Sequence, residues 1–217
     1  MEHSVPSNTV TVTPGRRRYT MGARADAVAR TRQQIIDAAA HRVRVTGEPL
    51  TLRDIAVQAG VSRTTIYRHF GSVTDLLDGV AADLLARARY GQLLAALELP
   101  DPIDALRQVI IAGTGIWASD PVLVRNLTRL ARVQPEALPV IAQLERGRLA
   151  AMEHLTARLR QAGRLRRGLT PDRAVDLLLV STAFAAWDEL VTSRNRSPAT
   201  ATDTIADLAI RAVVSDP

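Results

Sequence analysis

The chain of 217 residues contains no cysteine, which excludes a disulfide framework and thiolate metal sites. HExxH, GxSxG and glycine-rich phosphate-loop motifs are also absent, and the four histidines are widely spaced. Acidic pairs such as Asp188 and Glu189 are adjacent on an expected helix and therefore face different ways. We expect no catalytic residue, no metal and no cofactor, so the sequence does not favour an enzyme.

Hydrophobic runs long enough to cross a membrane are missing as well. The longest largely apolar stretch, Leu177 to Trp187, is shorter than the roughly 20 residues that span a bilayer. The first residues, Met1-Glu-His-Ser, lack the basic start and the apolar segment of a signal peptide. We therefore expect a cytoplasmic protein that does not bind a membrane.

Lysine is absent, so all 28 basic residues are arginine. Residues 16–90 carry 13 arginines against 7 acidic residues, a net charge of +6, whereas residues 91–217 carry 15 arginines against 14 acidic residues. Because the positive excess is concentrated in one third of the chain, this pattern indicates a nucleic-acid-binding segment there.

Strand-like alternation of apolar and polar residues is not found, and prolines separate helical patterns. The sequence therefore predicts an all-α fold, with an N-terminal three-helix head and a C-terminal helical body. The helices expected outside the most informative segment cover residues 24–45, 73–90, 103–118, 122–133, 138–162, 172–194 and 200–214.

The most informative segment, from Thr51 to Phe70, predicts two short helices joined by a tight turn. Gly60 tolerates the positive φ of such a turn, and Ser62 is a suitable N-cap for the second helix. Ile66 and Phe70 lie four residues apart and can pack inward. The residues that then point outward all donate hydrogen bonds or carry positive charge: Arg63, Thr64, Thr65, Tyr67, Arg68 and His69. Such a face suits phosphates and base edges, although an ordinary helical hairpin with a solvated polar face is the alternative.

The stretch at 172–194 is apolar nearly all the way round, and a helix apolar on every face must be covered on every face. The body itself can cover only one side, so a second copy of the chain is the natural cover for the other. We expect a homodimer in which the helices at 172–194 and 200–214 pair with their symmetry mates as a four-helix bundle. A central core helix in a monomer is the alternative.

The chain resembles the TetR family of bacterial transcriptional regulators. The resemblance runs from Arg30-Thr-Arg-Gln-Gln-Ile-Ile-Asp-Ala-Ala39 through Gly60-Val-Ser-Arg-Thr-Thr-Ile-Tyr-Arg-His-Phe70 to Leu76-Leu77. It implies an all-α homodimer with a DNA-binding head and a body that binds a small effector. The DNA-binding positions that it implies are the caps Thr51 and Ser62, the base readers Arg63 and Thr64, and the phosphate or groove contacts Thr65, Tyr67 and His69; Arg68 joins this set by its charge. One departure is Val73, where family members usually place a lysine.

These expectations divide the chain into a disordered arginine-containing arm at 1–23, a helix-turn-helix DNA-binding domain at 24–72, and an effector-binding and dimerisation domain at 73–217. The expected function is a dimeric repressor that a small-molecule effector releases from a palindromic operator in double-stranded DNA. The alternative is a DNA-binding dimer without such a switch, controlled by a partner protein or by abundance. The candidate effector-binding residues, which also suit the core, the dimer interface or the surface, are Trp117, Asn126, Arg129, His154, Phe184 and Trp187.

Overall fold

The computed structural model describes residues 15–215, where the chain forms helices and one isolated antiparallel bridge between Leu165 and Val214. The predicted all-α fold is confirmed. In chain order the elements are α1 (Gly15–Val45), α2 (Leu52–Gln58), α3 (Arg63–His69), α4 (Val73–Arg87), α5 (Gly91–Leu97), α6 (Pro102–Ser119), α7 (Pro121–Leu130), η1 (Pro135–Ala137), α8 (Leu138–Gln161), α9 (Pro171–Ser181), α10 (Phe184–Asp188), the π-helical turn η2 (Glu189–Ser193) and α11 (Pro198–Val213). No helix in this described range is long and apolar enough to span a bilayer.

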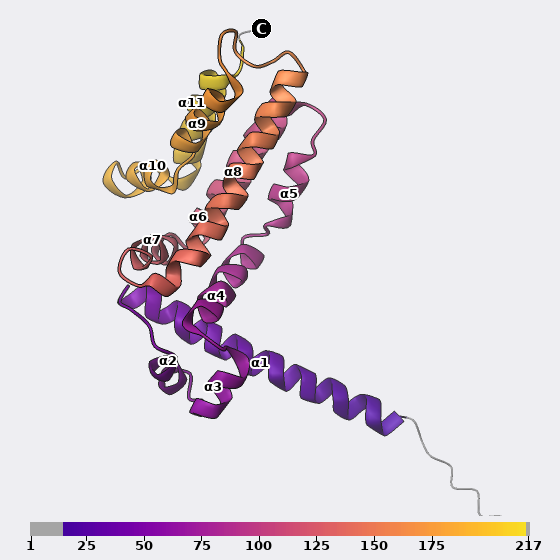
Figure 1. Cartoon of the computed structure of the whole chain (residues 1–217), viewed down its shortest axis with the longest axis vertical. Helices are drawn as coiled ribbons and strands as arrows, with labels where there is room; N and C mark the ends of the chain where they lie inside the picture. The colour runs from indigo at the N-terminus through magenta and orange to yellow at the C-terminus, as the bar shows by residue number, and fades with distance from the viewer. Residues whose placement is uncertain (1–14, 216–217) are drawn as a thin grey trace, which may run out of the picture.

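The head, made of α1, α2 and α3, lies at the lower end of the molecule, and α6 and α8 rise from it as the long axis of the body (Figure 1). α9 and α11 pack side by side on one flank of the body, and α5 packs against α6 on the other. α7 lies beside the C-terminal end of α1. The body is therefore joined to the head through α4 and α7.

Short polar side chains begin the helices of the head, as the sequence predicts. Thr51, Ser62 and Ser72 each accept a hydrogen bond from the N–H of the third residue of the helix that follows. Proline occupies the first turn of α6, α7, α9 and α11, where its missing N–H would have had no partner within the helix. Local chemistry thus sets where these helices start.

α1 begins at Gly15, so the prediction of a disordered arm at 1–23 is wrong for residues 15–23. Arginine and methionine, which this segment contains, are good helix formers, and extending an existing helix needs no new nucleus. An apolar stripe is therefore not required for the extension of α1 beyond the head. Residues 1–14 of the predicted arm lie outside the described residues.

The single helix predicted at 172–194 is wrong, because the structure divides this stretch into α9, α10 and η2. Thr182 Oγ1 donates to the carbonyl of Leu178 at 2.6 Å and so competes with the main-chain donors of the helix. Ala183 is extended, and Arg148 of α8 donates to a carbonyl in the last turn of α9. Hydroxyl groups and an arginine thus end α9 within an apolar sequence.

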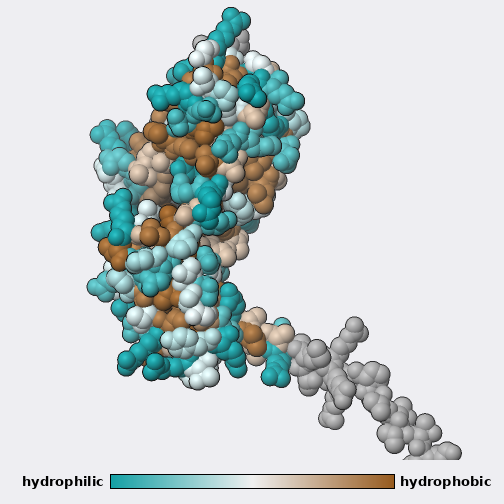
Figure 2. Space-filling model, viewed as in Figure 1, coloured by the Kyte–Doolittle hydropathy of each residue, from teal (hydrophilic) through white to brown (hydrophobic). Residues whose placement is uncertain are grey.

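Buried apolar side chains form two clusters. The head core contains side chains from the ranges Ile35–Leu84 and Leu123–Val140. The C-terminal core contains side chains from the ranges Ala96–Ile110 and Ala151–Val213. The predicted boundary at residue 72 stays a prediction, but packing assigns α4, α7 and η1 to the head core. On the surface, hydrophobic residues gather over the upper body, whereas hydrophilic and near-neutral residues cover most of the lower end (Figure 2).

Candidate nucleic-acid interface

The second helix of the predicted pair, α3, is fixed at its start by a cap and along its inner side by packing. Ser62 Oγ accepts a hydrogen bond from the N–H of Thr65 at 3.0 Å and lies 2.8 Å from Thr65 Oγ1. Ile66 and Phe70 are buried in the head core. Gly60, which precedes the cap, has a φ of +64°, as the tight turn requires.

The outer side of α3 is polar, and the sequence of this helix contains no acidic residue. Its exposed side chains are Arg63, Thr64, Tyr67 and Arg68, and its partly buried ones are Thr65 and His69. Guanidinium, phenol and hydroxyl groups can donate to phosphate oxygens or to base edges in the major groove. Because Arg63 stands in the first turn, the partial positive charge of the helix N-terminus adds to its own.

Thr51, the predicted cap of α2, is present as a cap. Its Oγ1 accepts a hydrogen bond from the N–H of Asp54 at 3.1 Å and donates to Asp54 Oδ2 at 2.8 Å. The phosphate contact expected of Thr51 stays a prediction. It requires the hydroxyl hydrogen to turn away from the Asp54 carboxylate.

His69 is the predicted contact whose surroundings fit DNA least. Its Nε2 is buried and has no hydrogen-bond partner among residues 24–215. Burial, and then the positive charges of Arg68 and Arg32, lower the pKa of His69 from its ordinary value of 6.5. The ring is therefore neutral at pH 7 and offers a phosphate no charge, so the contact predicted for His69 would be a hydrogen bond from a neutral ring, and it stays a prediction.

Arg32 of α1 is a residue that sequence reasoning missed. Its Nη1 donates to the main-chain oxygen of His69 at 3.0 Å, which satisfies a carbonyl at the C-terminal end of α3. Its guanidinium lies 4.3 Å from the centre of the Phe70 ring. Arg32 thus holds the end of α3 against α1. The sequence places it beside the apolar stripe of α1 but does not indicate which helix it meets.

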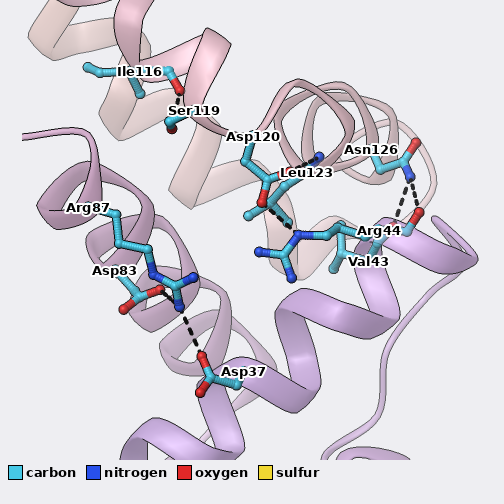
Figure 3. Close-up of polar contacts among 10 residues, drawn as sticks. All are labelled: Asp37, Val43, Arg44, Asp83, Arg87, Ile116, Ser119, Asp120, Leu123 and Asn126. Carbon is cyan, nitrogen blue, oxygen red and sulfur yellow. Dashed lines mark hydrogen bonds and ion pairs between the residues drawn. The ribbon is translucent and has the colours of Figure 1, made fainter.

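Asp120, the N-cap of α7, and Asn126, in the middle of α7, bind the C-terminal end of α1 (Figure 3). Arg44 Nε donates to Asp120 Oδ2 at 2.6 Å, and Asp120 also caps α7. Asn126 Nδ2 donates to the carbonyls of Val43 and Arg44 at 2.9 and 3.2 Å. These carbonyls belong to the last turn of α1, where they have no partner within the helix. The contacts therefore tie α7 to the head.

The segment after α7 binds the head as well. Gln134 accepts from the N–H of Leu50 and donates to the carbonyl of the same residue, both at 2.9 Å. Thr74 Oγ1 donates to the carbonyl of Glu136 at 3.0 Å. The start of α4 is thus bonded to η1, and Val73 packs against the head core where a lysine would have carried charge.

The six predicted effector residues do not share one cavity. The rings of Trp117, Phe184 and Trp187 pack together, with centres 5.8–6.2 Å apart. Trp187 is fully buried, and its Nε1 has no hydrogen-bond partner among the side chains that the structure describes. The other three are exposed on α7 or α8, or bonded to α1: Arg129, His154 and Asn126.

Residues 35–80 match the sequence model of a family described as "Bacterial regulatory proteins, tetR family". The chain is 31% identical over 103 residues to the HTH-type transcriptional repressor BepR of Brucella suis biovar 1 (strain 1330). This match covers 44% of the chain and 47% of BepR, so it spans about half the length of that relative.

The fold is similar to solved repressor structures. SmeT, the repressor of the Stenotrophomonas maltophilia multidrug efflux pump SmeDEF, superposes with a TM-score of 0.66 at 22% identity, covering 85% of this chain and 91% of SmeT. NalD, the secondary repressor of the MexAB-OprM multidrug efflux pump in Pseudomonas aeruginosa, gives a TM-score of 0.68 at 24% identity, covering 87% of this chain and 98% of NalD. At these identities the similarity establishes a shared fold.

Proposed function

We propose that this chain, whose residues 35–80 match the TetR family model, is a dimeric helix-turn-helix repressor that a small effector releases from a palindromic operator. The observation that carries this proposal is the outer side of α3, which exposes donors and positive charge and no carboxylate. A dimer would present two such helices about 34–36 Å apart, one turn of DNA.

In the proposed interface, Arg63 and Thr64 read base edges. A guanidinium can donate two hydrogen bonds to the O6 and N7 atoms of guanine, and a threonine methyl can contact that of thymine. The side chains assigned to phosphates or the groove wall are Thr51, Ser62, Thr65, Tyr67 and Arg68. Because Thr65 Oγ1 lies 2.8 Å from Ser62 Oγ, these two hydroxyls would meet one phosphate together.

Dimerisation is proposed through α9 and α11, within the ranges 172–194 and 200–214. These two helices pack side by side. Each exposes a large apolar side chain: Val180 in α9 is 75% exposed and Leu208 in α11 is 57% exposed. A second copy that covered both would bury this surface. A single concentration-independent mass in analytical ultracentrifugation, equal to that of one chain, would contradict this arrangement.

The effector is proposed to act on the C-terminal core, near Trp117, Phe184 and Trp187. A solved structure with a TM-score of 0.64 to this chain at 22% identity, SmeT, contains the small molecule triclosan, which supports the proposal of a small-molecule effector. The unpaired Nε1–H of Trp187 suits a ligand with a hydrogen-bond acceptor.

The alternative is a DNA-binding dimer that responds to a partner protein or to its own abundance. It is favoured by the mutual packing of the three aromatic rings, which occupies the space that an effector would need. A groove of about 360 Å³ lies elsewhere, between α8 and α9. A screen of small molecules for a shift in melting temperature separates the two functions. A compound that raises the melting temperature and releases operator DNA supports the switch, and none doing so supports the alternative.

The DNA-binding assignment is tested with Arg63→Ala, on an operator recovered by selection from random duplexes. We expect operator binding to weaken by about 1–3 kcal/mol and base preference to relax at the contacted position. The matched control is Arg167→Ala, an exposed arginine in the connection between α8 and α9, which lies at the end of the body away from the head (Figure 1). Unchanged affinity and base preference in Arg63→Ala would contradict the proposal.

A further inference from the structure

α7 is bonded on two sides to different parts of the molecule. Through Asp120 and Asn126 this segment holds the end of α1, as described above. The neighbouring residue in sequence, Arg125, bonds instead to the stretch formed by α10 and η2. One short helix thus has the head on one side and the C-terminal helices on the other.

The contact made by Arg125 is a two-pronged ion pair. Its Nε donates to Asp188 Oδ2 at 3.0 Å, and its Nη2 lies 2.5 Å from Asp188 Oδ1. The same Nη2 donates to Thr192 Oγ1 at 3.0 Å, and Thr192 Oγ1 donates to Asp188 Oδ1 at 3.0 Å. The side chains of Arg125 and Asp188 are 32% and 20% exposed, so solvent screens this pair less than a surface pair. Five atoms of three side chains therefore fix one geometry.

Asp188 lies at the junction between α10 and a π-helical turn. It is the last residue of α10 and is followed by the π-helical turn η2, a type of turn that often marks functional sites. The break at Thr182 separates α10 from α9. The residue before Asp188 is the buried Trp187, which packs in the C-terminal core. A shift of α10 would therefore carry Asp188 with it.

We propose that Arg125 is a positioning residue for operator binding, because its ion pair with Asp188 transmits the position of α10 and η2 to α7, and α7 in turn holds the head. α6 and α8 run through both cores and keep them together as a body. Among the described residues, however, the hydrogen bonds between α7 and the α10–η2 stretch are those of Arg125. The inference rests on the proposed function, since it assigns a role in operator affinity.

The test compares Arg125→Met and Asp188→Asn, which keep side-chain volume and remove the ion pair, with their double variant. The matched control is a second ion pair that lies within the body alone. Arg107 Nη2 lies 3.2 Å from Asp207 Oδ1 and joins α6 to α11, and Arg107→Met and Asp207→Asn remove this pair. Operator affinity is measured on a duplex obtained by selection. Hydrogen exchange at the N–H of Leu50, which bonds to Gln134, reports the attachment of the head without DNA.

We expect each single variant to weaken operator binding on the order of 10-fold and to speed exchange at Leu50, because α7 loses its hold on α10. The double variant should be no weaker than either single one, since both remove the same contact. Arg107→Met and Asp207→Asn should change neither readout.

Wild-type affinity and wild-type exchange in Arg125→Met would overturn the inference, and so would additive losses in the double variant. If Arg125→Met does not fold, Asp188→Asn and Thr192→Val carry the same test from the other side of the contact. Failure of the wild-type chain to select any duplex would refute the proposed function instead. Exchange at Leu50 would then still decide whether the ion pair holds the head.

Discussion

The head core and the C-terminal core are closed by different means. In the head core, the amide side chains of Asn126 and Gln134 bond to main-chain groups of distant segments, so helices of the head and body are locked at fixed positions. In the C-terminal core, arginine side chains do this instead, since Arg158 donates to the carbonyl of Pro100 and Arg148 to that of Leu179, and the helix after α9 is interrupted. From the interruption after α9 we expect the head to move as a block with α7, whereas the C-terminal core can adjust at α10 and η2.

The largest effect should come from cavities made in each core. Leu127→Ala in α7 and Leu178→Ala in α9 both truncate buried leucines, so each should cost about 2–5 kcal/mol of unfolding free energy, measured by denaturant titration. Hydrogen exchange separates them. Leu127→Ala should speed exchange in α2 and α3, and Leu178→Ala should leave those helices protected. If Leu127→Ala left the head protected, α7 would not belong to the block that includes the head.

A smaller effect is expected from the lock at Leu50. Gln134→Ala leaves the N–H and the carbonyl of Leu50 without partners in a buried place, which should cost about 2 kcal/mol of unfolding free energy. Gln108→Ala, at an exposed position of α6, should change the stability by about 0.5 kcal/mol or less. Equal losses from the two variants would show that the amide pair contributes nothing particular to the head core.

The helix of the proposed interface, α3, was predictable from sequence because its determinants are local. Gly60, Ser62 and Ile66 act on neighbours in the chain, and cap, turn and packing spacing can be read directly. The hydrogen bonds between Gln134 and Leu50 were not predictable. They join residues 84 positions apart, and the main-chain N–H and carbonyl that Gln134 binds would be present with almost any residue at position 50. The interruption after α9 depends on a hydroxyl and on Arg148 from another helix, so the apolar pattern alone predicted one continuous helix.

Replacing one glycine in the head and one in the body compares the main-chain conformation of the two parts. Gly60 in the head has a φ of +64° and open space around an added Cβ, so Gly60→Ala introduces backbone strain alone, about 1 kcal/mol. Gly115 in α6 has helical geometry and equally open space, so Gly115→Ala should stabilise the body by about 0.5–1 kcal/mol. Thermal unfolding of the two variants should therefore shift in opposite directions. Shifts of the same sign would place the strain elsewhere than at the turn.

The smallest effect concerns acidification, which should weaken the head before the C-terminal half. The pKa of His69 is lowered below 6.5, so below pH 6.5 the unfolded chain binds a proton that the folded head does not. The stability that neutral His69 contributes is therefore present above pH 6.5 and declines as the pH falls from 6.5 to the folded pKa. His69→Gln, which cannot titrate, should remove this decline in unfolding free energy.

Asp188 responds in a lower range of pH, because its hydrogen bonds with Arg125 hold its pKa below the ordinary value of 3.8 despite the opposing effect of burial. Its contribution is present above pH 3.8 and is lost as the pH falls through the folded pKa, since protonation then weakens the ion pair. Exchange in the head should therefore rise as the pH falls below 6.5, once corrected for the pH dependence of intrinsic exchange, while the contact of α7 with α10 persists. If Asp188→Asn abolished the decline in unfolding free energy below pH 6.5, or if His69→Gln left it unchanged, His69 would not be the group that makes the head sensitive to acid.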